Sequence, residues 1–160
     1  MEVRPARRGD LVGIGAIAQS SVWGAWGGLL RPETLASVLA RDYGPGALKQ
    51  RLLRGDLLVA VGERSGPVAF AEIEDEGDQI VVHIHAAHYA GEPCGAEVGA
   101  LLRWLRGRFP DRPVCVDVLL GDIDDERSCE EAGLVPGEVV QRSVHGEQVV
   151  ARRWWEPLPN

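Results

Sequence analysis

The segment from residue 80 to residue 109 constrains the fold most, because it combines a strand, a glycine-bearing turn and a helix. Residues 80–89 are rich in β-branched side chains, which strands favour. From Val98 to Phe109, apolar side chains recur at the spacing of one helix face. The first turn of a helix carries unpaired backbone N–H groups and the positive end of the helix dipole. The segment therefore predicts a strand that leads through a tight turn into an anion-binding helix N-terminus.

The rest of the chain shows strand and helix patterns in alternation. We expect strands at 3–8, 57–61, 68–74, 114–120, 137–144 and 147–155, and helices that begin at Leu11 (with Asp10 as N-cap) and Pro32 or span 47–54 and 122–132. The glycine-rich segment 23–28 is expected to be a flexible loop. Its two tryptophans, Trp23 and Trp26, either form a wall of an acceptor site or fill the core. Over 160 residues, this alternation predicts one α/β (α+β) domain spanning residues 1–160.

The composition excludes several classes of partner. A net charge of −7 argues against non-specific nucleic-acid binding and suits a cationic or amine partner. The three cysteines, Cys94, Cys115 and Cys129, form neither a disulfide framework nor a paired zinc motif. No apolar run is long enough to span a membrane, and the N-terminus lacks an apolar signal region. We therefore expect a cytoplasmic protein with neither nucleic acid nor membrane as a partner.

Three of the four histidines lie close together, at His83, His85 and His88. On a strand, His83 and His85 point to the same face. One interpretation is that His83 or His85 accepts a proton near neutral pH, as histidine does best. A second is a zinc site, with His88 or an acid as third ligand. A third is a pair of half-buried histidines whose hydrogen bonds are satisfied, and the sequence leaves all three open.

Several local pieces occur in a recognisable order along the chain. They are Val3-Arg4-Pro5-Ala6 followed by Asp10, Leu58-Val59-Ala60-Val61, Gly66-Pro67-Val68-Ala69-Phe70, Tyr89 and Gly91 with Gly95, and Glu130-Glu131-Ala132-Gly133-Leu134. In this order they resemble the GNAT superfamily of N-acetyltransferases over nearly the whole chain. The resemblance implies a mixed, mostly antiparallel twisted sheet of about six to seven strands, with about four helices on both faces. It also implies transfer of an acetyl or acyl group from acyl-CoA to a primary amine of a small molecule or peptide.

In that family, the turn after the central strand binds the pyrophosphate of acetyl-CoA through backbone amides. The resemblance implies contacts of acetyl-CoA with Ala86, Ala87, Ala90, Gly91, Cys94, Gly95 and Ala96. Gly95 matches the motif, whereas Ala90 stands where the family has Gln or Arg, and Pro93 stands at the middle glycine. Proline has no N–H to offer a phosphate, and Glu92 adds a negative charge. The turn therefore predicts acetyl-CoA binding that is weakened or lost.

The resemblance also implies positions for proton transfer. A tyrosine on the late helix usually protonates the departing thiolate, and that position here is Cys129. Its thiol either donates the proton or is a small buried hydrophobe. The nearest carboxylates are Glu72 and Glu74, on the strand before the central one. We assign catalysis to His83, His85, Cys129 and Glu72, and binding of the acceptor to Trp23, Trp26 and Glu74.

Two other functions stay open. The chain could be a non-catalytic GNAT-like binding or dimerisation protein that has lost acetyl-CoA binding. Trp154 and Trp155 face opposite sides of the last strand, so one of them could mark a homodimer surface. The third option is a small metal-binding protein that uses His83, His85 and His88. The acidic run 122–131 either attracts a cationic acceptor or is a solvated helix face.

Overall fold

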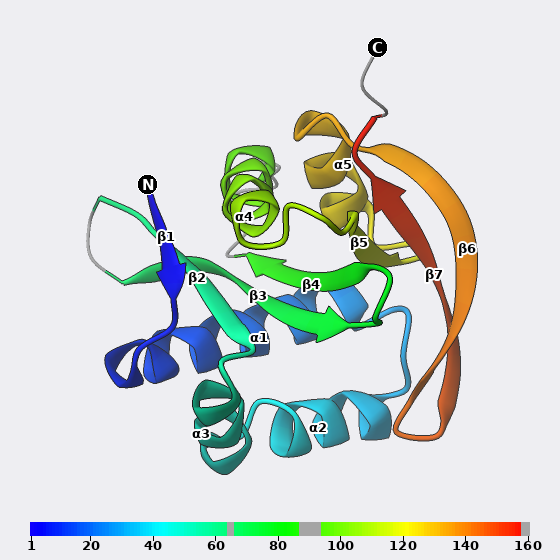
Figure 1. Ribbon diagram of the computed structural model, residues 1–160. Coiled ribbons are helices and arrows are strands. Elements are labelled where there is room, and N and C mark those ends of the chain that lie inside the picture. The colour runs from blue at the N-terminus through cyan, green and yellow to red at the C-terminus, as the bar shows by residue number, and fades with distance from the viewer. Residues whose placement is uncertain (64–65, 87–93, 158–160) are drawn as a thin grey trace.

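In the residues that the structure describes, 1–63, 66–86 and 94–157, the chain forms one seven-stranded sheet with helices on both faces. Figure 1 shows this computed structural model. The strands are β1 (Glu2–Pro5), β2 (Leu57–Val61), β3 (Pro67–Asp75), β4 (Ile80–Ala86), β5 (Val114–Leu119), β6 (Val135–Val144) and β7 (Glu147–Trp155). The helices are the short 3-10 helix η1 (Arg8–Asp10), α1 (Leu11–Trp26), α2 (Pro32–Arg41), α3 (Pro45–Arg54), α4 (Gly95–Arg108) and α5 (Ile123–Glu131). The predicted fold class is confirmed.

The strands lie in the order β1-β2-β3-β4-β5-β7-β6. Strands β4 and β5 pair in parallel, and every other neighbouring pair in the described chain is antiparallel. A parallel pair needs a crossover connection, and α4 supplies it. Strand β1 lies at an edge of the sheet, where Pro5 is tolerated because it has no N–H to donate to a ladder. The prediction of an edge strand at the N-terminus is therefore confirmed.

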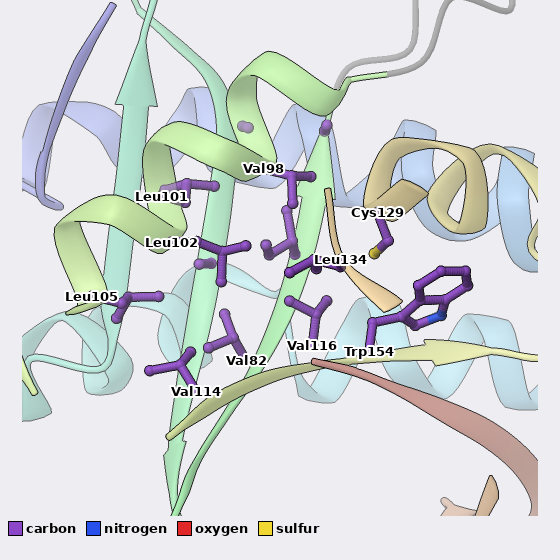
Figure 2. Close-up of a cluster of buried hydrophobic side chains, with 14 of the residues drawn as sticks. Val82, Val98, Leu101, Leu102, Leu105, Val114, Val116, Cys129, Leu134 and Trp154 are labelled. Atoms are coloured by element: carbon purple, nitrogen blue, oxygen red, sulfur yellow. The ribbon is translucent and has the colours of Figure 1, made fainter. Parts of the chain in front are cut away.

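Two apolar cores lie on opposite faces of the sheet. Because side chains alternate along a strand, Leu58 and Ala60 of β2 point to one core, and Leu57 and Val59 point to the other. Helices α4 and α5 cover the first face (Figures 1 and 2). Its buried side chains include Val82, Val98, Leu101, Leu102, Leu105, Val114, Val116, Cys129, Leu134 and Trp154. Helices α1, α2 and α3 cover much of the second face, where a second buried core forms.

The segment 23–28 is not the flexible loop that its glycines suggested, because α1 continues through Trp26. Each interior glycine costs a helix about 1 kcal/mol relative to alanine. Burial of an apolar face at helical spacing offsets that cost: Ile14, Ile17, Ala18 and Val22 are all buried. Tertiary packing therefore decides where this helix ends.

Asp10 precedes α1 as expected, but its carboxylate does not cap that helix. It accepts hydrogen bonds from the backbone N–H of Arg7 at 2.7 Å and from the guanidinium of Arg4 at 2.7 and 3.1 Å. The hydrogen bond from Arg4 holds the pKa of Asp10 below its usual value. The acid thus fastens the start of α1 to strand β1.

Strands β6 and β7 form a long hairpin that curves away from the rest of the sheet (Figure 1). At its turn, His145 and Gly146 both have positive φ, 45° and 86°, as a tight two-residue hairpin turn requires. Trp154 is buried, whereas Trp155 is partly exposed and donates its indole N–H to Glu138 at 2.9 Å. The two tryptophans therefore lie on opposite faces, and the homodimer stays a prediction. None of the described helices is long and apolar enough to cross a membrane.

Candidate active site

A cavity of about 260 Å³ lies where β4 and β5 stop pairing. The two strands are paired over residues 80–82 and 114–116, and the cavity begins at the next residues along each strand. Its walls come from α1, α2, β3, β4, β5, the start of α5 and the β6–β7 hairpin. The lining residues are Trp26, Val38, Asp42, Tyr43, Glu72, Glu74, His83, Ile84, His85, Asp117, Val118, Leu119, Asp125, Arg142, Ser143, Val144 and Ala151. In a parallel sheet, backbone groups beyond the last paired residue lose their ladder partner, so β4 presents such groups to the cavity.

His83 and Glu74 form a hydrogen-bonded pair in the cavity wall. The Nε2 atom of His83 lies 3.2 Å from Oε2 of Glu74, and the His83 side chain is 33% exposed. This hydrogen bond lowers the pKa of Glu74, so the carboxylate is ionised at neutral pH. A carboxylate that accepts from Nε2 favours the tautomer in which Nδ1 is the basic nitrogen. The pair therefore has the components of a general base with an orienting group.

His85 points to the same cavity but is held quite differently. It is 2% exposed, its Nδ1 lies 3.1 Å from the hydroxyl of Ser21, and its Nε2 lies 2.9 Å from the hydroxyl of Tyr43. Its ring stacks on Phe70 with centroids 4.9 Å apart, and Trp26 lies 5.5 Å away. Burial lowers the pKa of His85, so the ring is neutral at pH 7. Both ring nitrogens are occupied, and a catalytic role for His85 stays a prediction.

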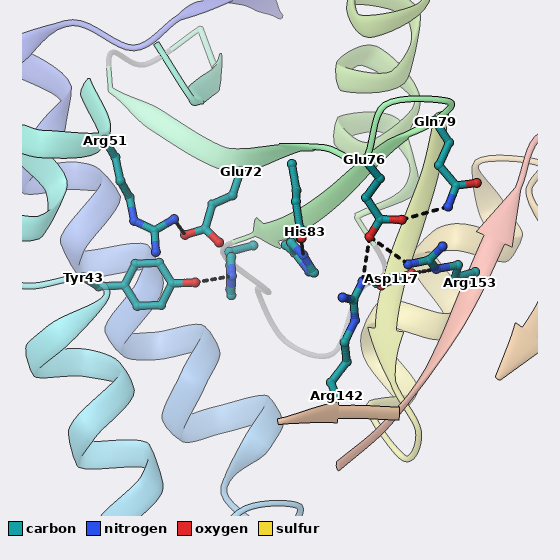
Figure 3. Close-up of polar contacts among 11 residues, drawn as sticks. Tyr43, Arg51, Glu72, Glu76, Gln79, His83, Asp117, Arg142 and Arg153 are labelled. Atoms are coloured by element: carbon teal, nitrogen blue, oxygen red, sulfur yellow. Dashed lines mark hydrogen bonds and ion pairs between the residues drawn. The ribbon is translucent and has the colours of Figure 1, made fainter. Parts of the chain in front are cut away.

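Glu72 lies between the two histidines and a nearby arginine. It is opposite His83 in the β3–β4 register, and its Oε1 lies 2.9 Å from Nη1 of Arg51. Arg51 also lies over the ring of Tyr43, 5.6 Å from the centroid (Figure 3). The side chain of Glu72 is only 12% exposed, so this ion pair replaces much of the water that the carboxylate has lost. Arg51 thus fixes Glu72 in the wall; its assignment as a catalytic group stays a prediction.

A charged network that was not predicted from the sequence extends from the cavity wall, where Asp117 and Arg142 lie. Asp117 is paired with Arg142 and with Arg153, whose Nε lies 3.2 Å from its Oδ1. Arg153 reaches Glu76 at 3.1 Å, so the network joins β5, the β6–β7 hairpin and the end of β3 (Figure 3). One signal could have indicated it: Asp117 is the sole charged residue in the otherwise apolar stretch 114–120. A buried charge in such a strand requires a partner.

The tip of the β6–β7 hairpin fastens onto α2 and closes one side of the cavity. Oε1 of Glu147 accepts hydrogen bonds from the backbone N–H of Arg31 at 3.0 Å and from the hydroxyl of Thr34 at 2.7 Å. Farther along, Nε2 of His145 lies 3.0 Å from Oδ2 of Asp42. Both contacts join segments more than 100 positions apart in the chain. The cavity therefore depends on the hairpin as well as on the separation of β4 and β5.

The start of α5 brings Asp125 into the cavity wall, and Asp122, the N-cap of this helix, is buried nearby. Asp125 lines this cavity and a smaller adjoining one, which Ser128 and Cys129 also line. Asp122 is 2% exposed, and its Oδ1 accepts the backbone N–H of Asp125 at 3.2 Å. Burial raises the pKa of Asp122 to about 7, and the neighbouring Asp125 adds to that rise. Cys129 is 1% exposed, and burial raises the pKa of its thiol far above the usual range.

The N-terminus of α4 is the place at which the resemblance positions a pyrophosphate. The backbone N–H of Cys94 donates to the hydroxyl of Ser128 at 2.9 Å, so it already has a partner. A Cβ atom on Gly95 would lie 2.6–2.9 Å from side-chain atoms of Glu131. The side chain of Glu131 therefore packs directly against Gly95 at the start of α4. Among the described residues, the engaged amide of Cys94 and the close approach of Glu131 to Gly95 disfavour a pyrophosphate at this helix N-terminus.

Of the remaining predicted site residues, some line a cavity, one is exposed, and four lie outside the described residues. Trp26 lines the cavity, whereas Trp23 is 44% exposed and does not line it. Ala86 ends β4 and lines the smaller cavity together with Cys94. Four candidates lie outside the described residues: Ala87, His88, Ala90 and Gly91. Across residues 1–63, 66–86 and 94–157, no group of three His, Cys, Asp or Glu side chains is placed to hold a metal ion.

Comparison with solved structures confirms the fold. A GCN5-related N-acetyltransferase from Rhodopseudomonas palustris superposes with a TM-score of 0.72 at 20% identity, over 98% of this chain and 95% of that one. The PaiA N-acetyltransferase from Thermoplasma acidophilum, solved in complex with coenzyme A, gives 0.70 at 14% identity, over 96% and 98%. A ribosomal-protein-alanine N-acetyltransferase from Brucella melitensis gives 0.64 at 19% identity, over 99% and 100%. This chain therefore has the GNAT fold.

Sequence comparison alone finds no such relationship. No protein-family model matches the chain, and no curated protein matches it either. The predicted resemblance to GNAT N-acetyltransferases is thus confirmed through the three-dimensional structure, at the level of the fold. Function has to be argued from the residues of the cavity.

Proposed function

We propose that the protein transfers an acyl group from an acyl thioester to the amine of a small molecule or peptide. The observation that carries this proposal is the His83–Glu74 pair in the wall of the cavity between β4 and β5. A base with a carboxylate behind it, next to strand backbone that lacks a ladder partner, suits attack of an amine on a carbonyl. The GNAT fold supports the same reaction class by analogy.

The charge of the cavity favours a cationic acceptor. Among the described lining residues, five are Asp or Glu and one is Arg. Most of these carboxylates have partners, as Glu72 has in Arg51. The lining residues together still carry more negative than positive charge around the cavity. Such an excess attracts an ammonium group. The same negative charge repels anionic acceptors. We therefore expect selectivity for amines that carry more than one positive charge.

The acceptor loses a proton to Nδ1 of His83, and Glu74 stabilises the resulting imidazolium. The neutral amine attacks the thioester carbonyl, whose oxygen is held by backbone N–H groups of β4 beyond Val82. The tetrahedral intermediate collapses to an amide and a thiolate. His83 is partly exposed, so its proton returns to water after each turnover.

The donor is an acyl thioester, and the crowded N-terminus of α4 affects which thioester can bind. Glu131 beside Gly95 and the engaged amide of Cys94 disfavour the diphosphate of coenzyme A. A thioester of pantetheine lacks that diphosphate. We therefore expect acetyl-pantetheine to be used about as well as acetyl-CoA, in contrast to an enzyme that binds the nucleotide strongly.

The same crowding favours one alternative, a binding protein with this fold that no longer uses acyl-CoA. A single experiment separates the two. Purified protein is incubated with acetyl-CoA or acetyl-pantetheine and with a panel of amines, among them an alkyl diamine and a neutral arylamine. Mass spectrometry should detect the acetylated diamine with at least one donor. Absence of any amide product with both donors would favour the binding protein.

A further inference from the structure

Strand β6 leaves one long edge of the sheet open. It is the last strand in the sheet order, and β7 is its one neighbouring strand in the described chain (Figure 1). The strand at the opposite edge, β1, has four residues and ends at Pro5, whereas β6 has ten. A proline and a register irregularity in β6 lie before residue 139, so residues 139–144 pair regularly with β7. Because β6 lacks the short length that protects β1, its outer edge is open to a further strand.

The pairing of β6 with β7 determines which backbone groups point outward. The carbonyl of Val150 accepts the N–H of Leu120 at 3.0 Å, so the backbone groups of Val150 face β5. In antiparallel strands, successive residues face one neighbour and then the other. Gln141, which is opposite Val150, therefore directs its N–H and C=O away from β7. The same alternation directs the backbone groups of Val139 and Ser143 outward.

The side chains of β6 are complementary to an antiparallel copy of the same strand. The strand contains no lysine, the residue that often protects an open edge, and Val139 is 47% exposed. Its two charged residues are Glu138 and Arg142, which lie two positions to either side of Val140 and on one face. A hydrogen bond from the indole of Trp155 lowers the pKa of Glu138, so its carboxylate is ionised at neutral pH. Opposite charges thus flank Val140 symmetrically.

We propose that two copies of this chain pair through β6, antiparallel about a two-fold axis at Val140. Glu138 then lies opposite the partner's Arg142, and Arg142 opposite the partner's Glu138. The outward backbone groups of Val139 and Gln141 bond to those of the partner's Gln141 and Val139, so the two sheets become continuous. A two-fold axis makes each contact occur twice. This dimer does not depend on the acyl-transfer reaction.

Charge selects this register over its neighbours. A two-fold axis perpendicular to the sheet leaves each side chain on its own face, so it passes through a residue and not between two. An axis at Glu138 or at Arg142 would place like charges opposite each other, which destabilises a strand pair. An axis at Val139 or at Gln141 would place each charge opposite a neutral residue. The axis at Val140 pairs opposite charges at non-hydrogen-bonded positions, where facing side chains approach most closely.

Analytical ultracentrifugation of the whole chain tests the association. Pairing over one strand buries little surface, so we expect a dissociation constant in the micromolar range. Between about 1 μM and about 500 μM protein, the mass should rise from 17.3 kDa toward twice that value. A chain that stays monomeric over this range overturns the proposal.

Two variants test the edge and the register separately. Gln141→Pro removes an outward N–H and keeps the bonds to β7, so it should raise the dissociation constant by about tenfold or more, whereas Gln141→Ala should not. Glu138→Arg places like charges opposite each other at two positions and should raise the constant by about tenfold. Trp155→Phe, its matched control, removes the same indole hydrogen bond and should leave the constant unchanged. If Gln141→Pro does not fold, Glu138→Arg decides.

Amide hydrogen exchange measured by NMR gives a readout that is specific to this pairing. The amides of Val139 and Gln141 should exchange rapidly in dilute protein and become protected as the dimer forms. Those of Val140 and Arg142 face β7 and should be protected at every concentration. A dimer that forms without this alternating change, or that is equally strong in Glu138→Arg, uses another surface and overturns the proposal.

Discussion

The hydroxyl of Tyr43 lies 2.9 Å from Nε2 of His85, inside a ring of aromatic side chains. This contact joins the end of α2 to the middle of the sheet. Tyr43→Phe removes the hydroxyl and leaves a nitrogen of a buried imidazole without a partner. An unsatisfied buried group costs about 1–3 kcal/mol, so we expect the free energy of unfolding to fall by that amount. Chemical denaturation at pH 7 measures it, with Arg54→Lys on the exposed end of α3 as the control.

His85 also predicts how stability depends on pH. Burial lowers its pKa in the folded protein, so below about pH 6.5 the unfolded chain binds a proton that the folded protein does not. The stabilising contribution is therefore present above pH 6.5 and is lost as the pH falls. Denaturation from pH 7.5 to pH 5 should show declining stability in the wild type and a shallower decline in His85→Gln. Identical slopes would mean that folding does not change the pKa of His85.

His83 and Glu74 predict a graded loss of turnover. His83→Gln removes the base and should lower kcat by about 10²–10⁴-fold, as general-base removal does. Glu74→Gln keeps the base but removes the charge that stabilises its imidazolium, so the loss should be smaller. Steady-state kinetics with the best diamine measures both. Glu63→Gln, on an exposed turn, is the control, and unchanged turnover in His83→Gln would show that another group accepts the proton.

Glu131 and Gly95 predict a coupled effect on stability. The Cβ atom of Gly95→Ala would lie 2.6 Å from Cβ of Glu131, and neither atom can move without its backbone. Overpacking of this kind costs about 1–3 kcal/mol. In Glu131→Gly the obstacle is gone, so Gly95→Ala should then be nearly neutral or stabilising. A double-mutant cycle by denaturation measures the coupling; two independent, additive effects would mean that the helices do not approach as closely as described.

The same glutamate predicts a change in donor binding. Glu131→Gln removes a negative charge near the first turn of α4 and keeps the shape of the side chain. We expect tighter binding of coenzyme A, by about threefold to tenfold at low salt, because a helix N-terminus favours an anion once the competing charge is gone. Binding of pantetheine should be unchanged. Calorimetry with the two ligands decides this, and equal effects on both would exclude an interaction with the diphosphate.

Glu147 predicts that the hairpin tip affects binding of the acceptor. Glu147→Ala removes the acceptor of hydrogen bonds from Arg31 and Thr34 and releases the tip from α2. We expect a rise in KM for the amine of several-fold with a smaller change in kcat, because the tip closes a wall but holds no reacting group. Gln148→Ala, the next residue along β7, is the control. A loss confined to kcat would contradict this role.

Much of the fold was predictable because its signals are local. The apolar runs of strands β2, β4 and β5 and the apolar stripe along α4 are each confined to one element, and a single sequence displays them. The end of α1 was not predictable, since Gly24 and Gly27 favour a loop and only packing of the preceding turns on the sheet overrides them. The capping role expected of Asp10 failed for a similar reason: Arg4, on a different element, binds the carboxylate more strongly.

The site was predictable only in part. The alternation that places His83 and His85 on one face can be read from residue spacing, but their different partners cannot. Glu74 is nine positions from His83 and Tyr43 is 42 from His85, and these separations close only through strand pairing and helix packing. In the sequence, Asp122 is only one of several acidic residues at the expected start of a helix. Its burial, which raises the pKa of its carboxyl group, depends on how α5 packs against the sheet.

A map of where an acyl thioester binds would show directly whether this cavity carries out acyl transfer. Backbone amide resonances of the isotope-labelled protein are recorded by NMR during titration with a non-hydrolysable acetyl-pantetheine analogue. We expect the largest shifts on residues 83–86 of β4, residues 117–119 of β5 and Asp125. Shifts confined to other surfaces, or none at millimolar ligand, would contradict the assignment of this cavity to acyl transfer.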